Sequence, residues 1–339
     1  MYVLGIETSC DETAASVVRD GRDIISNIVS SSLRFHQRYG GIVPEIAFRK
    51  QLEAIESVSG CALEEAGLKL RDIKLVSVTS GPGLLGSLLV GVSFAKAISL
   101  GAGIPLIGLN HLHSHIYASF LNGSTVKLPC IALVVSGGHT TLFHVRDFDR
   151  IEIIGSTSDD ACGEAFDKVA KILGLGYPGG PAIERLAGKG NPNKMRFKCS
   201  GTERPLDFSF SGIKTAVLYY VRRTAYGVPR KGKTFNPLPL PVIQDIAASF
   251  QEVVINTLVH KAFLACQKKK VPRLVIGGGV VANDKLRAAF LHRAAAEGVK
   301  IYFPAKPLCM DNAAMVAGLG YQLFKIGLRC GLRLNVNLN

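Results

Sequence analysis

The feature that most constrains the fold of this chain is a strand–turn–strand pattern that occurs twice. Residues 2–18 consist of a short apolar run, a polar turn with Thr and Ser, and a second apolar run. Residues 130–145 repeat this layout with different letters and with two glycines in the turn. A strand, a turn of small residues and a returning strand explain both stretches. The sequence therefore predicts an internal duplication, with two similar domains that face each other across a cleft.

Strands that alternate with helices follow each of these openings. The buried run at residues 75–79 enters a glycine turn, residues 84–99 form an apolar helix, and residues 104–109 form the next strand. In the second half, residues 273–276 lead through three glycines into a helix that starts at Asp284. This alternation predicts a doubly wound α/β sheet, in which ligands gather at the carboxyl ends of the strands.

One stretch raises the question of a membrane span. Residues 75–95 contain no charged side chain and are long enough to cross a bilayer. Gly81-Pro82-Gly83 interrupts the stretch, and several Ser and Thr residues make it polar, so a strand, a loop and a buried helix explain it better. The N-terminus enters a strand directly, without a basic signal region. We therefore expect a cytoplasmic protein that has no membrane partner.

The formal net charge of +14 favours a polyanionic partner, above all a nucleic acid. Basic residues crowd residues 222–233 and residues 268–273, where they could follow a phosphate backbone. The alternative is a basic surface that only keeps the protein soluble. The 8 cysteines are scattered without a CxxC spacing, which is typical of reduced thiols in a cytosolic protein.

Three histidines cluster in Asn110-His111-Leu112-His113-Ser114-His115. His111 and His115 share one face of a helix, so they can present two imidazoles to one point. Such a pair is half of a zinc or iron site and needs a third ligand from elsewhere. The alternative is a helix cap or a solvated cluster. Asp311, at the start of the C-terminal helix, is either the third ligand or an N-cap, and the pattern by itself favours the cap.

Glycine turns offer places for an anion. In the turn Ser136-Gly137-Gly138-His139-Thr140, the glycines allow main-chain amides to approach a phosphate closely. A hairpin turn without a ligand is the alternative. The glycines at 277–279 do not meet GxGxxG, so Asn283 behind them caps a helix or bonds a ligand. The acids Glu7, Asp11 and Glu12 either hold a cation or a water, or are ordinary turn acids.

Short motifs spread over the chain carry a family resemblance. In chain order they are Gly5–Thr13, Asn110–His115, Val135–Thr140, Glu164–Lys168, Tyr177–Pro181, Asp207–Gly212, Gly278–Asn283 and Asp311–Met315. Together they resemble the bacterial TsaD family, the threonylcarbamoyltransferases that modify tRNA. The match spans nearly the whole chain in the right order, which makes it far more specific than any one motif.

The resemblance implies an α/β fold that is duplicated into two lobes around a cleft, as in actin, sugar kinases and Hsp70 (RNase H-like). Residues 1–127 with 312–339 are expected to form the N-terminal lobe, and residues 128–311 the C-terminal lobe. The implied reaction moves the threonylcarbamoyl group of threonylcarbamoyl-AMP to N6 of adenosine 37 in tRNAs that read ANN codons. This reaction forms t6A and releases AMP.

The resemblance also implies the site residues. His111, His115 and Asp311 would hold one divalent metal ion, iron(II) or zinc. The adenylate pocket would consist of Val135, Ser136, Gly137, Gly138, His139, Asp167, Gly180, Glu184 and Asn283. Relatives commonly have Asp at the position of Glu184, which leaves the reach of its longer side chain towards the ribose or adenine open. Glu12 is the candidate catalytic base.

Bacterial relatives act with a degenerate, TsaB-like paralogue and with a small, TsaE-like P-loop ATPase. The resemblance thus implies these two protein partners besides tRNA and threonylcarbamoyl-AMP. Residues 227–241 match no motif of the family and are expected to form a loop.

Three other functions suit parts of the sequence. A zinc metalloprotease would suit the paired histidines, but residues 112–114 place no Glu between them, unlike HExxH. A sugar kinase or ATPase could use the same scaffold, because a fold does not determine function. The histidine pair and the charge of +14 speak against it. A non-catalytic subunit that binds tRNA or proteins would not need pocket motifs in both lobes.

Overall fold

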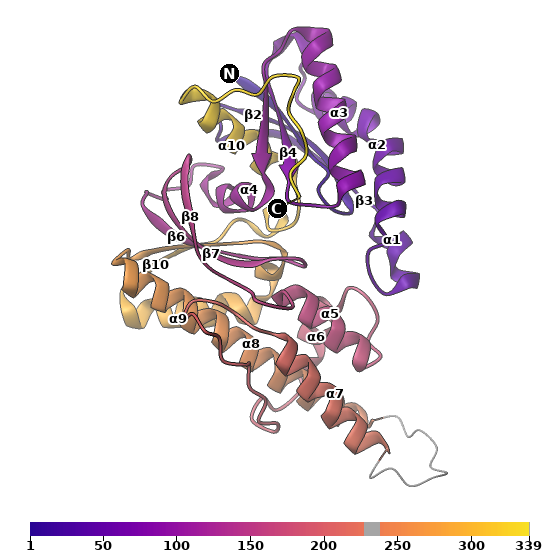
Figure 1. Cartoon of the computed structure of the whole chain (residues 1–339), viewed down its shortest axis with the longest axis vertical. Helices are drawn as coiled ribbons and strands as arrows, with labels where there is room; N and C mark the ends of the chain where they lie inside the picture. The colour runs from indigo at the N-terminus through magenta and orange to yellow at the C-terminus, as the bar shows by residue number, and fades with distance from the viewer. Residues whose placement is uncertain (227–237, 339) are drawn as a thin grey trace.

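The computed structural model describes residues 1–226 and 238–338, which form two five-stranded mixed sheets with helices (Figure 1). The first sheet has the order β3-β2-β1-β4-β5 and consists of β1 (Tyr2–Glu7), β2 (Glu12–Arg19), β3 (Asp23–Ser31), β4 (Ile73–Gly81) and β5 (Leu106–Asn110). The second has the order β10-β9-β6-β7-β8 and consists of β6 (Cys130–Val135), β7 (Thr140–Asp147), β8 (Arg150–Ser156), β9 (Arg273–Gly277) and β10 (Lys300–Tyr302).

The two sheets share one topology, which confirms the predicted duplication. In the first sheet β1, β2 and β3 are antiparallel neighbours, whereas β1, β4 and β5 are parallel neighbours. In the second sheet β6, β7 and β8 are antiparallel in the same way, and β6, β9 and β10 are parallel. The third strand of this repeat, β8, was not predicted from the sequence.

The helices of the first lobe are α1 (Leu33–His36), α2 (Pro44–Glu65), α3 (Leu85–Ala102) and α4 (His111–Tyr117). Those that follow β8 are α5 (Cys162–Ile172), α6 (Gly179–Ala187), α7 (Ser211–Tyr226), α8 (Leu240–Lys269), α9 (Asp284–Glu297) and α10 (Ala313–Lys325). Short 3₁₀ helices are η1 (Gln37–Tyr39), η2 (Leu70–Asp72), η3 (Ala118–Phe120), η4 (Gly279–Ala282) and η5 (Lys306–Leu308).

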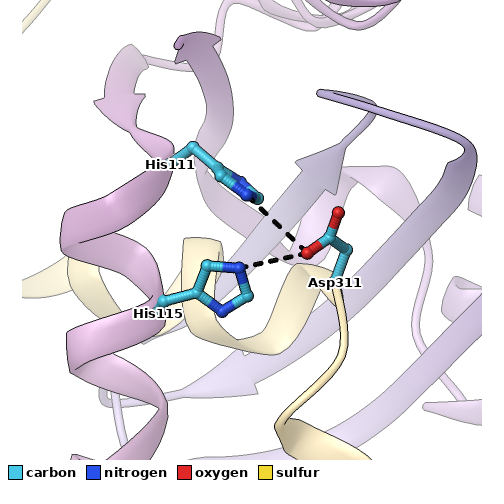
Figure 2. Close-up of side chains that lie close together, drawn as sticks. All are labelled: His111, His115 and Asp311. Atoms are coloured by element: carbon cyan, nitrogen blue, oxygen red, sulfur yellow. Dashed lines mark ion pairs between the residues drawn. The ribbon is translucent and has the colours of Figure 1, made fainter. Parts of the chain in front are cut away.

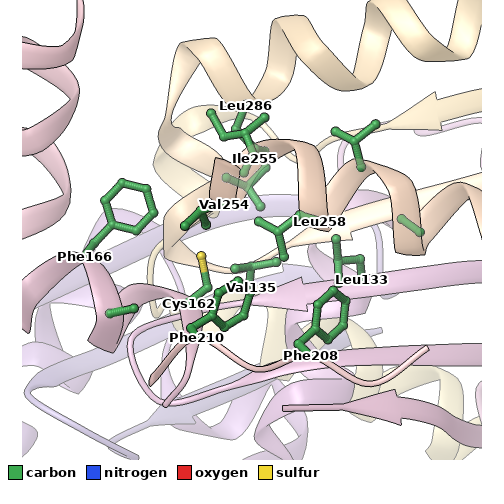
Figure 3. Packing of buried hydrophobic residues seen from close by; sticks show 14 of the residues in the cluster. Leu133, Val135, Cys162, Phe166, Phe208, Phe210, Val254, Ile255, Leu258 and Leu286 are labelled. Carbon is green, nitrogen blue, oxygen red and sulfur yellow. The ribbon is translucent and has the colours of Figure 1, made fainter. Parts of the chain in front are cut away.

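Three main apolar cores hold these layers together. One lies between the second sheet and its helices, where Phe208, Phe210 and Leu258 are fully buried (Figure 3). Another joins apolar residues of β1, β2, β4, β5, α4 and α10 to residues of β6, β7 and β9, so it connects the two sheets. The third lies between the first sheet and the helices α2 and α3.

The C-terminal helix α10 returns to the first sheet. It follows the second sheet in the sequence but packs on β1, β2 and β4. This packing supports the assignment of residues 312–339 to the N-terminal lobe, whose exact boundaries stay a prediction. Residues 121–129, which lead from the first lobe to β6, contain neither helix nor strand.

Two expectations from the sequence can be compared with single segments. Within the described part of the chain, one helix, α3, is long and apolar enough to cross a membrane by length and composition alone. It packs against α2 and β4, as the predicted helix of an α/β layer does.

Of the predicted loop 227–241, residues 227–237 lie outside the described residues. The predicted end of this loop is wrong, because Leu240 and Pro241 begin α8.

Candidate metal centre and its surroundings

The helix α4 places the two predicted histidines at the carboxyl end of β5. The side chain of Asn110 caps this helix, because its Oδ1 accepts hydrogen bonds from the amides of Leu112 (2.9 Å) and His113 (3.2 Å). His111 and His115 are both buried, and their ring centroids lie 4.6 Å apart. The predicted common face of the two imidazoles is therefore confirmed.

Asp311 joins the histidines from the segment before α10 (Figure 2). Its Oδ1 lies 3.1 Å from Nε2 of His115 and 3.7 Å from Nε2 of His111. The expectation that Asp311 caps α10 is wrong, because Asn312 is the N-cap and its Oδ1 accepts from the amide of Met315 (3.2 Å). With the cap position taken by the next residue, the carboxylate of Asp311 is free to contact the histidines.

The three side chains fit one divalent metal ion. One ligand atom from each lies within 4.8 Å of the other two. Nδ1 of His115 is buried and forms no hydrogen bond with the described residues, and Nε2 faces the oxygen of Asp311. A buried polar atom without a partner costs free energy, and an ion is one way to satisfy it. Two imidazole nitrogens and a carboxylate oxygen are a donor set that zinc and iron(II) accept.

A second layer of residues orients His111. Oε2 of Glu7, at the end of β1, lies 3.2 Å from Nδ1 of His111 and accepts from the hydroxyl of Thr79 (2.6 Å). Oε1 of Glu7 accepts from the amide of Ser9 (2.6 Å). When Nδ1 of His111 donates to this carboxylate, its Nε2 keeps a lone pair on the side of Asp311. From the sequence, Glu7 was predicted only to hold a cation or a water or to be a turn acid, because no local pattern indicates its contact with His111.

The carboxylates of Glu7 and Asp311 need a positive charge nearby. Burial raises the pKa of Asp311, but His111 and His115 outweigh burial and lower it to about 2. Burial likewise raises the pKa of Glu7, and the charge and hydrogen bond of His111 bring it below the ordinary value. Burial lowers the pKa of His111, whereas Glu7 and Asp311 raise it to about 9. A proton on His111 or a bound cation can balance the two carboxylates.

Glu12, the candidate base, has a high pKa in this environment. Burial, together with the charges of Asp311 and Asp11, raises the pKa of Glu12 to about 10. Its carboxyl group is therefore neutral near pH 7 when only the described residues act on it. A cation beside Asp311 would offset that negative charge and lower the pKa of Glu12. Burial and the same acids hold the pKa of the Cys10 thiol well above its ordinary value, so this thiol is not a nucleophile.

The predicted adenylate residues begin at the carboxyl end of β6. Val135 is buried at the end of this strand, and residues 136–139 form the turn to β7. The amide of Ser136 donates to the carbonyl of His139 (2.8 Å), which closes the turn. A Cβ atom on Gly137 or Gly138 would meet no atom within 4 Å, so this side of the turn is open to a ligand.

Close backbone contacts bring other predicted residues to this turn. Gly278 packs against the backbone of Val135, and Gly163 of α5 against that of Ser136 and Gly137. Oδ1 of Asp167 on α5 accepts from the amide of Gly179 (2.7 Å), at the start of α6 and next to Gly180.

The remaining predicted residues lie where α6 meets α9. Oδ1 of Asn283 caps α9 by accepting from the amide of Leu286 (2.8 Å), and its amide group donates to Gln251 (2.9 Å). Oε1 of Glu184 accepts from the amide of Asp284 (2.7 Å). Asn283 therefore acts as a cap, which is one of the two predicted alternatives.

Two ionisable groups near these residues have shifted pKa values. Burial, together with the charges of His111 and His115, lowers the pKa of His139 to about 4. Burial, then the charges of Asp167 and Asp11, raise the pKa of the Tyr177 phenol.

Gly5 is the contact point that positions Asp311. It lies in β1 under the first turn of α10, and a Cβ atom there would collide with the backbone of Ala313 and Ala317. We expect Gly5→Ala to destabilise the protein by about 1–3 kcal/mol, because overpacking displaces α10. The midpoint of thermal unfolding measures this effect. Gly60→Ala in α2 is the control, because its added methyl meets no atom within 4 Å. An equal loss in both variants would contradict the role of Gly5.

Comparisons with known proteins agree with this picture. The model of the TsaD family, described as tRNA N6-adenosine threonylcarbamoyltransferase, matches residues 23–318. A protein of that name from Dictyoglomus turgidum is 48% identical over 339 residues, which cover 99% of this chain and 98% of the relative. Another from Symbiobacterium thermophilum is 49% identical over 333 residues, which cover 98% and 94%.

Solved structures show the fold. Full-length HypF matches 96% of this chain with 46% of its own, at a TM-score of 0.60 and 15% identity. Component A of (R)-2-hydroxyglutaryl-CoA dehydratase from Acidaminococcus fermentans matches 95% of this chain with 98% of its own, at a TM-score of 0.53 and 18% identity. These likenesses confirm the predicted duplicated, actin-like two-lobe α/β architecture. The family match and the relatives show the function class: the chain is a transferase and belongs to the TsaD family of tRNA N6-adenosine threonylcarbamoyltransferases.

Proposed function

We propose that this protein transfers the threonylcarbamoyl group of threonylcarbamoyl-AMP to N6 of adenosine 37 in tRNAs that read ANN codons. The products are t6A and AMP. The observation that carries this proposal is that the end of β9 joins the open glycine turn to the buried group of His111, His115 and Asp311, because Gly277 packs against the backbone of His115 and Gly278 against that of Val135. The turn suits the adenylate phosphate, and the buried group suits a metal ion that faces the reacting carbonyl.

His111, His115 and Asp311 are the proposed ligands of one iron(II) or zinc ion. When bound, such an ion supplies Lewis-acid catalysis and a template for substrate oxygens. The chain's own contribution is to hold the three ligands in place before substrate arrives. Glu7 and Thr79 fix His111, and the cap by Asn312 leaves Asp311 directed at the histidines.

The reaction exchanges one bond for another at the carbamoyl carbon. N6 of adenosine forms a bond to this carbon, the bond from the carbon to the phosphate oxygen breaks, and one proton leaves N6. An exocyclic adenine amine is a weak nucleophile and the mixed anhydride is a reactive donor, so positioning carries much of the barrier. The amides of Gly137 and Gly138 suit the phosphate of the departing AMP. Glu12 is the proposed acceptor of the proton, once positive charge beside Asp311 has lowered its pKa.

Several residues of the proposed adenylate pocket hold its walls together. Asp167 connects α5 to α6 through Gly179, and Glu184 connects α6 to α9 through Asp284. Asn283 holds the start of α9 and reaches Gln251 of α8. These contacts support a pocket of defined shape for the adenylate, with Val135 and Gly180 at its edges.

The protein partners are proposals as well. Between α2 and α3 lies an apolar hollow of about 570 Å³ that is lined by Phe48, Leu52, Ile55, Gly86, Leu89, Val90, Ser93 and Phe94. Leu52 and Leu89 are exposed there. Exposed apolar patches of this kind mark protein–protein interfaces. We assign this hollow to the TsaB-like paralogue and keep the TsaE-like ATPase as a second partner, with all three acting in the cytoplasm.

We expect Leu89→Asp to weaken binding of the TsaB-like partner by at least about 10-fold, because a charge would be buried in an apolar contact. Titration calorimetry with the purified partner measures this loss. Leu100→Asp is the control, because Leu100 is also an exposed leucine of α3 but does not line the hollow. Unchanged binding by the Leu89 variant would place the partner elsewhere.

The proposed function is tested by incorporation of labelled threonine into tRNA. Purified protein is incubated with threonylcarbamoyl-AMP, an unmodified ANN-decoding tRNA and both partners, and AMP release is followed in parallel. We expect incorporation by the native chain and none by Asp311→Ala. Absence of incorporation by well-folded components, beside a working positive control, would favour a kinase on the same scaffold or a binding subunit.

A further inference from the structure

A segment that the proposed reaction does not use lies directly against the acidic turn of the candidate site. This rim segment, residues 31–43, connects β3 to α2. The amide and the hydroxyl of Ser32 both donate to the carbonyl of Asp11, at 3.0 Å and 2.8 Å. The hydroxyl of Ser31 donates to Oε1 of Glu12 (3.2 Å). The start of the rim segment is thus bound to Asp11 and Glu12, in the acidic turn between β1 and β2.

A buried histidine gives the rim segment a defined shape. Nδ1 of His36 accepts from the amide of Val43 (3.2 Å), so the proton of a neutral ring is on Nε2. Nε2 lies 2.9 Å from the hydroxyl of Ser32, which in turn donates to Asp11. One ring therefore connects both ends of the segment to the acidic turn. The buried ring of His36 therefore holds the outer residues of the rim segment in place, although these residues face solvent.

The outer face of the rim segment combines cations with an exposed aromatic ring. Arg34, Arg38 and Tyr39 are exposed, and the side chain of Tyr39 keeps 51% of its surface accessible. Within the described chain, neither arginine forms an ion pair with a carboxylate. The Arg38 guanidinium lies 4.8 Å from the centre of the Tyr39 ring. The next two glycines face open space, because a Cβ atom on either would meet nothing within 4 Å.

This placement distinguishes the rim segment from the basic stretch at residues 268–273. In Figure 1, α1 lies at the end of the first lobe that faces α5 and α6 of the second lobe. Lys268 and Lys270 instead lie just before β9, at the amino end of its strand, whereas its carboxyl end at Gly277 packs against the backbone of His115. A cation at the amino end of β9 therefore lies at the opposite end of this strand from the candidate metal centre.

We propose that the rim segment binds the RNA strand beside the target adenosine. Arg34 and Arg38 pair with phosphates of that strand, and Tyr39 stacks on an unpaired neighbouring base. The inference rests on the proposed function, because an adenosine that enters the site must leave the base stack. Its neighbour then loses a stacking partner, which an exposed aromatic ring replaces. Unpaired arginines beside that ring are the groups that hold the backbone of a single strand.

Binding of an anticodon stem-loop RNA, measured without donor or partners, tests this proposal. We expect Tyr39→Ala to weaken binding about 5- to 150-fold, the range for loss of one base–aromatic stack, whereas Tyr39→Phe binds like the native chain. We expect Arg34→Ala/Arg38→Ala to reduce the slope of log K against log salt by about 1.4, which is about 0.7 for each lost phosphate contact. In turnover assays, KM for tRNA rises while KM for threonylcarbamoyl-AMP does not.

The matched control is Arg71→Ala/Lys74→Ala. Like the double rim variant, it removes two positive charges. They lie at exposed positions at the amino end of β4, whereas the candidate site lies near the carboxyl end of this strand. We expect this control to keep the native affinity and activity. All variants should keep the native unfolding temperature, because the altered side chains are exposed.

The outcomes separate this proposal from the proposed function. Native affinity and salt slope in the rim variants, or an equal loss in the Arg71/Lys74 control, would overturn the role of the rim segment. If the native chain transfers threonine but its RNA binding does not depend on Arg34, Arg38 and Tyr39, the rim proposal fails and the proposed function is retained. Rim-dependent RNA binding without any transfer would overturn the function and keep the RNA surface.

Discussion

His115→Ala is expected to abolish metal retention and threonylcarbamoyl transfer together. The imidazole is fully buried and contributes a ring nitrogen 3.1 Å from Asp311, and no other described side chain can take its place in this group. Loss of a residue that only supports a ligand costs about 10- to 100-fold in metal affinity or activity, so loss of a ligand should exceed about 100-fold. Metal content after purification and labelled threonine in tRNA measure the two effects. His111→Ala is expected to behave in the same way.

His113→Ala is the matched control for this experiment. His113 lies on the same helix, between the two candidate ligands, but its ring packs on Phe143 with centroids 5.9 Å apart. Burial lowers the pKa of His113 to about 4, so it is a neutral packing residue near pH 7. Its replacement should lower the unfolding temperature and leave the metal content intact. Full activity in a metal-free His115 variant would contradict the assignment of the site.

Glu7→Gln is expected to lower metal affinity about 10- to 100-fold, although the substitution conserves shape. The carboxylate faces only donors: the amide of Ser9, the hydroxyl of Thr79 and Nδ1 of His111. An amide has one oxygen and one NH₂ group, so its NH₂ must face one of these donors. If it faces His111, Nδ1 becomes the acceptor and the proton moves to Nε2, which removes the lone pair that a metal needs.

Competition with a chelator measures this affinity, and the nitrogen shifts of His111 in NMR spectra report which ring nitrogen carries the proton. A purely structural role of Glu7 would change stability without changing that tautomer. Thr79→Ser is the conservative control, because it keeps the hydroxyl donor to Glu7. A Glu7→Gln variant with native metal affinity and the native tautomer would show that Glu7 does not orient His111.

Much of the local structure follows from residue order. Alternating apolar runs and glycine turns predicted the strands of both openings, and their repetition predicted two lobes of one topology. The histidine pair was predictable because residues four apart share one face wherever a helix forms. The resemblance then added residues such as His139 and Asp167, whose roles no local pattern reveals.

The role of Asp311 depended on the tertiary structure. Its position before a helix favoured a cap, and only the return of α10 to the first sheet brings it to His115, far away in the sequence. The layer formed by Glu7 and Thr79 depends in the same way on the parallel pairing of β1 with β4. The raised pKa of Glu12 depends on burial and on Asp311.

The sequence by itself therefore determined most of the elements, their duplication, the family and the histidine half of the site. These features depend on periodicity, turn residues and motif order, all of which act over a few residues. Only the tertiary structure shows that Asp311, which residue order favoured as a cap and the family resemblance implied as a ligand, lies beside the histidines. It also decided that Glu7 contacts His111 and that the cationic rim segment lies against Asp11 and Glu12. Those contacts join distant parts of the chain, and the packing of helices on sheets, not residue spacing, determines which side chains meet.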